Sequence, residues 1–116
     1  MELSKSDWKL FRERLPNWQE RYMDNLIREY AKFLADDRLQ PSERFWTLNK
    51  RIQEDRRRPG VQIELRKQRA VFELARLIAD GAVSLDELDG FSEELQNMVR
   101  VLCERIELEE QQEQLT

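Results

Sequence analysis

The small number and the placement of helix-breaking residues most constrain the fold of this chain. Its 116 residues include only three glycines and three prolines. Turn-rich folds use these residues heavily, whereas Leu, Arg and Glu, which dominate here, are good helix formers. The breakers stand at positions 16, 41, 59, 60, 81 and 90 and divide the chain into a few segments. We therefore predict an all-α protein, an irregular bundle of five or six helices.

In the first half of the chain, apolar residues recur at three- and four-residue intervals. We expect a short first helix, capped by Ser4 or Ser6 and interrupted at Pro16. A helix from Asn17 to about Asp37 should form the spine of the core, because its periodicity is the strongest in the chain. Its apolar positions are Trp18, Tyr22, Met23, Leu26, Ile27, Tyr30, Phe33 and Leu34. We expect a third helix from about Ser42 to Arg57. The side chains of this helix that should point toward the core are Phe45, Trp46, Leu48 and Ile52.

The second half begins after the break at Pro59-Gly60. Val61, Ile63 and Leu65 alternate as in a strand, but no second strand is predicted to pair with them, so we assign residues 61–81 to a fourth helix. Ser84 and Glu87 have the spacing of a capping box and predict a one-turn helix that ends at Gly90. A last helix should open at Ser92. We expect one helical domain over residues 1–106 and an acidic, frayed or disordered tail over residues 107–116.

The net charge of −4 hides an uneven distribution of charge. Residues 50–69 carry three acidic side chains and eight basic ones, which are Lys50, Arg51, Arg56, Arg57, Arg58, Arg66, Lys67 and Arg69. Residues 80–116 carry eleven acidic and two basic side chains. The basic segment could contact an anionic partner such as nucleic-acid phosphates. Alternatively, its arginines complement a helix dipole and line solvated faces, or they meet the acidic end of another molecule. Because the acidic end outweighs the basic segment, we favour a protein partner over nucleic acid.

Residues 77–88 have the helix–glycine–serine pattern often seen at the entry to a helix-turn-helix. The helix that would read DNA, however, would begin Ser92-Glu93-Glu94 or run through Asp86-Glu87. Phosphate groups would repel these carboxylates. We therefore interpret the segment as an ordinary helix corner.

Few catalytic groups are present in the sequence. It has no histidine, which excludes the commonest general base and the Ser-His and Cys-His nucleophile systems. It has no Cys-x-x-Cys pair and no glycine-rich phosphate loop, and Cys103 is predicted to be an ordinary semi-buried thiol. We therefore predict that the protein is not an enzyme and that it has no catalytic residues, no cofactor and no metal site. The alternative is an enzyme that uses only carboxylate, arginine and tyrosine groups.

Several large apolar residues are candidates for an interface. Trp8, Trp18 and Trp46 fall on apolar stripes, so core packing is the first interpretation, and one of them could instead anchor a partner. The last helix carries Leu95, Val99, Leu102 and Ile106 at four-three-four spacing. This stripe predicts an internal seam. If the helix projects beyond the bundle, the stripe becomes a homodimer contact, and we keep it with Trp46 as a candidate interface.

A resemblance to known proteins is carried by six segments, which span most of the chain: Asp7-Trp8, Pro16–Met23, Ser42–Trp46, Lys50–Ile52, Pro59–Val61 and Asp89–Leu95. In these segments the chain resembles a family of short all-helical bacterial proteins associated with mobile elements. Some members carry the label multidrug transporter, which does not fit helices that are amphipathic and interrupted by charge. The resemblance implies a cytosolic accessory protein, such as a regulator or inhibitor that acts by binding. We accordingly expect a cytoplasmic protein that works through protein–protein interaction, with no membrane partner; the alternative is nucleic-acid binding through residues 50–69.

Overall fold

The computed structural model describes residues 3–115, and all regular structure in that range is helical. The four α-helices are α1 (Lys5–Leu34), α2 (Pro41–Asp55), α3 (Ala70–Ala79) and α4 (Glu93–Leu115). Two short 3₁₀ helices, η1 (Lys67–Arg69) and η2 (Leu85–Leu88), precede α3 and α4. No strand occurs within residues 3–115. The all-α prediction is confirmed, but with four α-helices rather than five or six.

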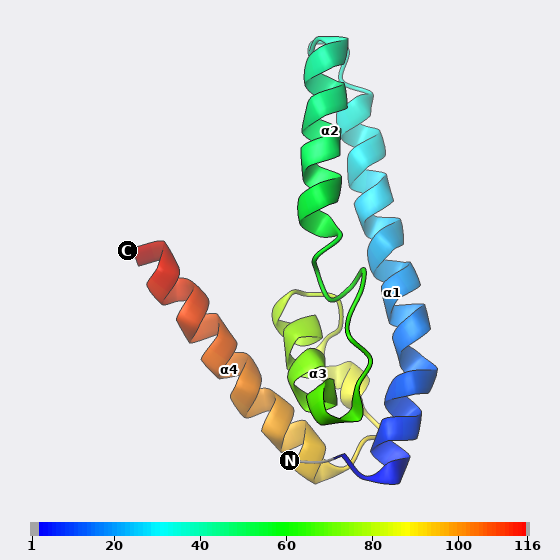
Figure 1. Cartoon of the computed structure of the whole chain (residues 1–116), viewed down its shortest axis with the longest axis vertical. Helices are drawn as coiled ribbons and strands as arrows, with labels where there is room; N and C mark the ends of the chain where they lie inside the picture. Colours follow the sequence, from blue (N-terminus) through cyan, green and yellow to red (C-terminus); the bar gives the residue numbers. More distant parts are fainter. Residues whose placement is uncertain (1–2, 116) are drawn as a thin grey trace.

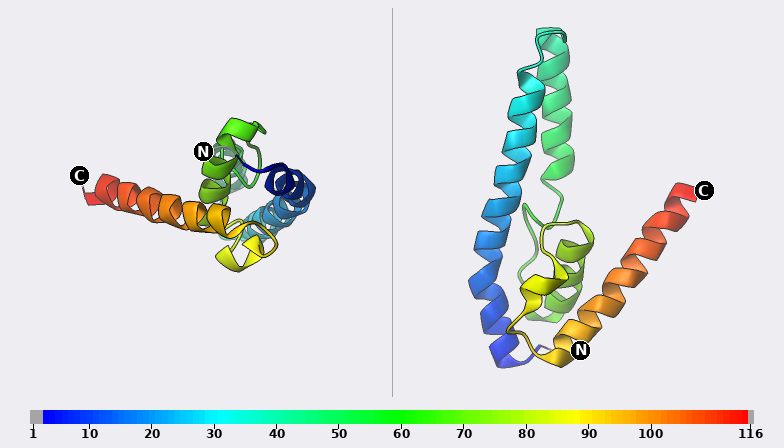
Figure 2. Two further views of the ribbon diagram at one scale, coloured as in Figure 1. Left: turned by 90° about the horizontal axis from the view of Figure 1, so that it is seen from below. Right: turned by 180° about the vertical axis from the view of Figure 1, so that it is seen from behind.

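The molecule has an elongated shape, with two projecting parts. The C-terminal half of α1 and the antiparallel α2 form a two-helix arm, which we define as residues 19–55 (Figure 1). The remainder of residues 3–103 forms the body, and α4 leaves it in a different direction from the arm (Figure 2). The Cα radius of gyration is 16.7 Å. A compact domain of this length would have a radius near 13 Å, so a large share of the chain lies outside a single globule.

Helix α1 passes through Pro16 without interruption, so the predicted break into two helices is wrong. Pro16 lacks an N–H and costs the helix one hydrogen bond. The turns on either side, however, place Phe11, Leu15 and Trp18 in the core, where each is at most 6% exposed. Packing therefore holds the helix continuous across the proline. At its start, Ser4 is the N-cap, and its hydroxyl accepts a hydrogen bond from the Asp7 N–H.

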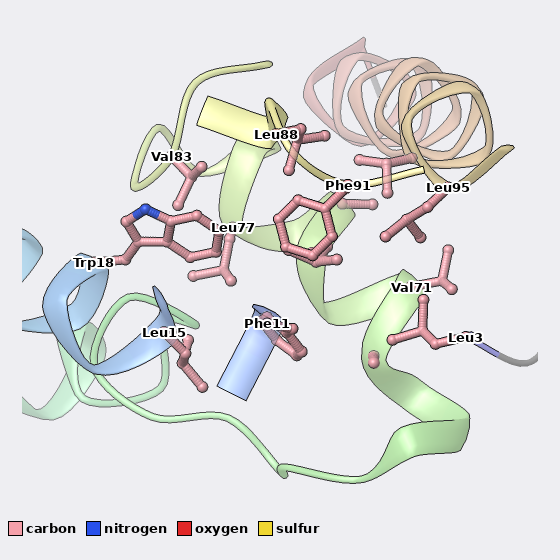
Figure 3. Close-up of a cluster of buried hydrophobic side chains, with 14 of the residues drawn as sticks. Leu3, Phe11, Leu15, Trp18, Val71, Leu77, Val83, Leu88, Phe91 and Leu95 are labelled. Atoms are coloured by element: carbon pink, nitrogen blue, oxygen red, sulfur yellow. The ribbon is translucent and has the colours of Figure 1, made fainter. Parts of the chain in front are cut away.

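The core lies in the body and surrounds α3. Trp18 of α1 lies beside Leu77 of α3 in the close-up of the core, and Val71 of α3 lies beside Leu3 (Figure 3). Phe11 and Leu15 of α1 belong to the same cluster. The chain from the end of α3 into α4 closes the core from the other side; its buried apolar residues are Ala82, Val83, Leu88, Phe91, Leu95, Val99 and Cys103. The centre of the core is therefore α3, the most apolar helix of the four, and the predicted spine over residues 17–37 is wrong.

The arm contributes no fully buried apolar side chain to this core, and of its residues only the half-buried Tyr22 packs against it. From residue 19 to residue 54 every side chain is exposed or half-buried. In α2, Phe45, Trp46 and Ile52 are exposed and only Leu48 is half-buried, so the prediction that all four point inward is wrong. The cause lies in the architecture: the arm has two helices and no third element to cover their apolar stripes.

The segment between α2 and α3 is extended rather than helical, so the helix predicted to begin at Val61 is wrong. Residues 62–66 have no regular structure, and η1 starts only at Lys67. Gly60 passes directly under an aromatic ring: a Cβ on Gly60 would lie 2.4 Å from Cγ of Tyr22. Position 60 therefore requires glycine for close approach of the backbone to α1.

The connection from α3 to α4 forms as the sequence predicts. Gly81 has φ +81° and Gly90 has φ +95°, and Ser84 and Glu87 form the predicted capping box around the start of η2. Asp7, at the start of α1, accepts hydrogen bonds from the Ser92 N–H at 2.9 Å and from the Ser92 hydroxyl at 2.6 Å. Helix α4 then continues to Leu115, so residues 107–115 are helical and exposed rather than frayed.

Candidate functional site

Half of the basic side chains of residues 50–69 are paired with neighbouring carboxylates. Arg51 binds Glu29 at 3.0 Å, Arg58 binds Asp80 at 2.6 Å, and Arg66 binds Glu64 at 2.8 Å. Arg69 binds the buried Glu73. Within residues 3–115 the basic members without an ion pair are Lys50, Arg56, Arg57 and Lys67. The structure therefore divides the predicted anion-binding set into paired and unpaired halves and does not form one basic patch.

A chain of hydrogen bonds joins the arm to the body. The Tyr30 hydroxyl donates to Asp55, and Arg58 donates to Asp55 at 3.3 Å and to Asp80 at 2.6 Å. Asp80 also accepts a hydrogen bond from the Tyr22 hydroxyl at 3.0 Å. The network thus links α1, the end of α2 and the end of α3. Both carboxylates accept hydrogen bonds from more than one side chain, so they hold the arm against the body.

The two tyrosines of the network are hard to ionise. Burial and the nearby negative charge of Asp80 raise the pKa of Tyr22 to about 12. Burial and the hydrogen bond to Asp55 raise the pKa of Tyr30 to about 12. Both phenols therefore remain neutral donors at physiological pH, and neither is suited to act as a base.

Beside this network, the arm carries an open apolar groove. A hollow of about 300 Å³ runs between α1 and α2 and meets almost no polar surface. Its apolar walls, which we call the arm groove, are formed by Met23, Leu26, Ile27, Tyr30, Ile52 and Val61. Ile27 is 61% exposed. Because water contacts this apolar surface, covering it would be favourable.

The apolar surface continues beyond the groove toward the tip of the arm. Leu34 lies two turns beyond Ile27 on α1, and Phe45 lies two turns before Ile52 on the antiparallel α2, so both continue the same face. Phe45 is 61% exposed. Its ring packs edge-on against Trp46, with ring centroids 5.0 Å apart. We call Met23, Ile27, Leu34, Phe45 and Ile52 the apolar face of the arm.

The candidate interface on α4 lies mostly inside the molecule. Leu95 and Val99 are 0% exposed and pack in the core, so they have no surface to offer a partner. Leu102 and Ile106 are half-buried against the core. Trp46 is 64% exposed. The predicted internal seam is therefore present over the first turns of α4, and Trp46 is the one member of the candidate set that is fully open to a partner.

The remaining sequence candidates take structural positions. Trp18 is buried, and Trp8 is half-buried with Arg12 over its ring. Cys103 is buried, its thiol lies 3.4 Å from the Ala75 carbonyl oxygen, and burial raises the pKa of the thiol. A buried thiol with a raised pKa is poorly reactive. The structure therefore gives Cys103 the surroundings of a core residue.

Sequence reasoning missed the arm groove, although the signal was present. Met23, Ile27 and Tyr30 on α1 and Phe45, Leu48 and Ile52 on α2 recur at the four-three spacing of a helix-pairing seam. This spacing is the same for a stripe that faces its own core and for one that faces a partner. The location of the core had to be known before the two cases could be separated.

Comparisons with known proteins were made at three levels. No protein-family model, no curated protein and no solved structure matches the chain. Within residues 3–115, no helix combines the length and the apolar character that crossing a bilayer requires.

Proposed function

We propose that this chain is a non-enzymatic protein that acts by protein–protein contact and uses the apolar face of the arm to do so. One observation carries the proposal: a two-helix arm projects from a well-packed body, and none of its apolar side chains between residues 19 and 54 is buried. An isolated helix pair gains little stability from such a surface, whereas a partner that covers it gains the hydrophobic contribution. The resemblance to accessory proteins of mobile elements, and a cytoplasmic location, fit a regulator or inhibitor of this kind.

The alternative of nucleic-acid binding has less support. Four of the eight basic residues in the segment are already paired with carboxylates, so only part of their charge is available to phosphates. Arg56 and Arg57 are the adjacent pair left over. A salt-sensitive gel shift that disappears in the double variant Arg56→Glu, Arg57→Glu would favour this alternative over ours.

Site-specific photo-crosslinking in living cells tests the proposal. A crosslinking amino acid is placed at Ile27 or Phe45 on the apolar face, and as matched controls at Arg28 and Gln53, which follow on the same helices and point to other sides. We expect protein adducts from positions 27 and 45 and few from 28 and 53. Equal yields at all four positions, or no protein adduct at any of them, would contradict the proposal.

A further inference from the structure

The apolar face of the arm has the dimensions and pattern of half of a four-helix bundle. Both helices carry apolar residues at four-three spacing, and they run antiparallel with their stripes on the same side. In four-helix bundles, two such hairpins pack face to face with the stripes turned inward. One further hairpin of the same kind would therefore complete the bundle. The charges and the area of the arm indicate which hairpin this is.

The arm has nearly equal numbers of acidic and basic side chains, which favours a partner that is also almost neutral. Residues 19–55 carry eight acidic and seven basic side chains, so the arm is almost neutral. An acidic or basic partner would find no strong opposite field here, whereas a second copy would meet no net repulsion. The same neutrality does not hold for the distal half of α4, which is strongly acidic.

Two unpaired charges of opposite sign frame the base of the apolar face. Glu20 lies two turns before Ile27 on α1, and Arg56 lines the arm groove at the end of α2. Neither makes an ion pair within residues 3–115. A rotation of 180° about an axis that runs parallel to the arm, along its apolar face, generates a second arm with α1 of each copy against α2 of the other. In that arrangement Glu20 of one copy approaches Arg56 of the other, and both charges find a partner.

The area of the face is enough for a weak, reversible dimer. α2 has 15 residues, which correspond to a length of about 22 Å. Two helices side by side present a face roughly 20 Å wide, so two such faces bury about 900 Å² in total, below the roughly 1,200 Å² of stable interfaces and typical of transient ones. We therefore expect a dimer that forms and dissociates reversibly with concentration.

From these observations we infer that a second copy of this chain covers the apolar face of the arm: two arms, related by a two-fold axis along their length, form a four-helix bundle. The inference rests on the proposed function and names its partner. It uses residues that the body leaves exposed, so it requires no rearrangement of the core. The interface is isologous, so the assembly closes at two copies.

Sedimentation equilibrium of the purified full chain over a concentration series tests the inference. We expect a monomer–dimer equilibrium. Ile27→Asp should raise the dissociation constant by about 100-fold, because it places a charge in the dry seam. The matched control is Leu108→Asp on α4: Leu108 is also 61% exposed but lies outside the arm. The control should stay within about threefold of the parent chain, since it leaves the seam intact. Circular dichroism confirms that both variants keep the parental helix content.

A charge exchange tests the orientation of the two arms. Glu20→Arg and Arg56→Glu should each raise the dissociation constant several-fold, and the double variant should restore it, because the exchanged charges again meet across the axis. Failure of the double variant to recover would overturn the proposed orientation.

The outcomes separate this inference from the proposed function. A chain that stays monomeric at every concentration, or a dimer that Ile27→Asp leaves intact, overturns the second copy as the occupant. If crosslinks from positions 27 and 45 then join the chain to a different protein, the proposed function stands and only its partner is wrong. If neither self-association nor any crosslink is found, both fall.

Discussion

The two halves of α1 have the same spacing of apolar residues, but the residues of the first half are buried in the core and those of the second half line an open groove. In the first half, Phe11, Leu15 and Trp18 step by four and three and are buried against α3. In the second half, Met23, Ile27 and Tyr30 step by the same intervals and line an open groove. One uninterrupted helix therefore runs from the core of the body to an uncovered surface in the arm.

The difference between the halves lies in what surrounds them. The first half is covered by α3, by η2 and by the start of α4, whereas the second half lies along α2 and touches the body only at its base, through Arg21 and Tyr22. The polar flank between α1 and α2 is closed by the network of Tyr30, Asp55 and Arg58. The apolar flank is closed by nothing within residues 3–115. A helix that keeps an apolar stripe beyond the reach of its own core is the reason to look for a partner there.

Truncation of matching apolar residues in the two halves should give the largest contrast. Phe11→Ala removes a ring that is 0% exposed and should lower the free energy of unfolding by about 3–5 kcal/mol. Ile27→Ala should cost less than about 1 kcal/mol at dilutions where the chain is monomeric, because Ile27 is already mostly in water. Urea denaturation followed by circular dichroism measures both. Equal losses would mean that the arm is as well covered as the body.

The acidic residues of the two halves extend the same contrast. Asp7→Ala removes the acceptor of two hydrogen bonds from Ser92 and should lower the free energy of unfolding by about 2 kcal/mol. Asp24→Ala removes an exposed pair with Arg28 and should cost about 0.3–0.5 kcal/mol. The same denaturation experiment measures both values. A loss at position 24 as large as that at position 7 would contradict the view that the first half of α1 is held more strongly by the rest of the fold than the second half.

Local signals predicted much of this structure because their physics is local. The Ser4 cap, the Ser84–Glu87 capping box and the left-handed Gly81 each depend on a few neighbouring residues, and each is found as predicted. Pro16 misled the prediction of α1, because the energy that keeps the helix continuous comes from core contacts distant in sequence. Val61–Leu65 was misassigned for a related reason: Gly60 fits under Tyr22, and the chain beyond it crosses the body in an extended form.

The candidate site was less accessible to sequence reasoning than the fold class. The basic residues at 50–69 were found by counting, but their carboxylate partners Glu29, Glu73 and Asp80 are distant in sequence or need the helix geometry to be recognised. Trp46 was kept as a candidate anchor, and the structure leaves it exposed. Leu95 and Val99 were candidates of equal standing, and they are in the core. Periodicity identifies which side chains share a face, and only the packing of the whole chain decides what that face touches.

The contact between Gly60 and Tyr22, where the body meets the arm, can be tested by substitution. Gly60→Ala places a methyl group against the Tyr22 ring and should lower the free energy of unfolding by about 1–3 kcal/mol through overpacking. In a Tyr22→Ala background the same substitution should cost much less, since the obstructing ring is gone. A double-mutant cycle by urea denaturation measures the coupling, which we expect to be at least about 1 kcal/mol. Additive losses would mean that the two residues do not meet.

Titration of the two tyrosines compares the junction between body and arm, where Tyr22 lies, with the arm itself, where Tyr30 lies. It is the comparison with the smallest expected effect. Tyr22 and Tyr30 are the two tyrosines of the chain, and the folded protein raises the pKa of each to about 12. Ultraviolet titration of the phenols should therefore show little ionisation at pH 10, where an unfolded chain would be half ionised. Because the folded state holds these protons more tightly, the stabilising contribution is fully present below pH 10 and is lost as pH rises from 10 through 12. The variants Tyr22→Phe and Tyr30→Phe assign the two titrations. If the signal left in Tyr22→Phe appeared near pH 10, Tyr30 would be solvated, and the arm would be less well ordered than its junction with the body.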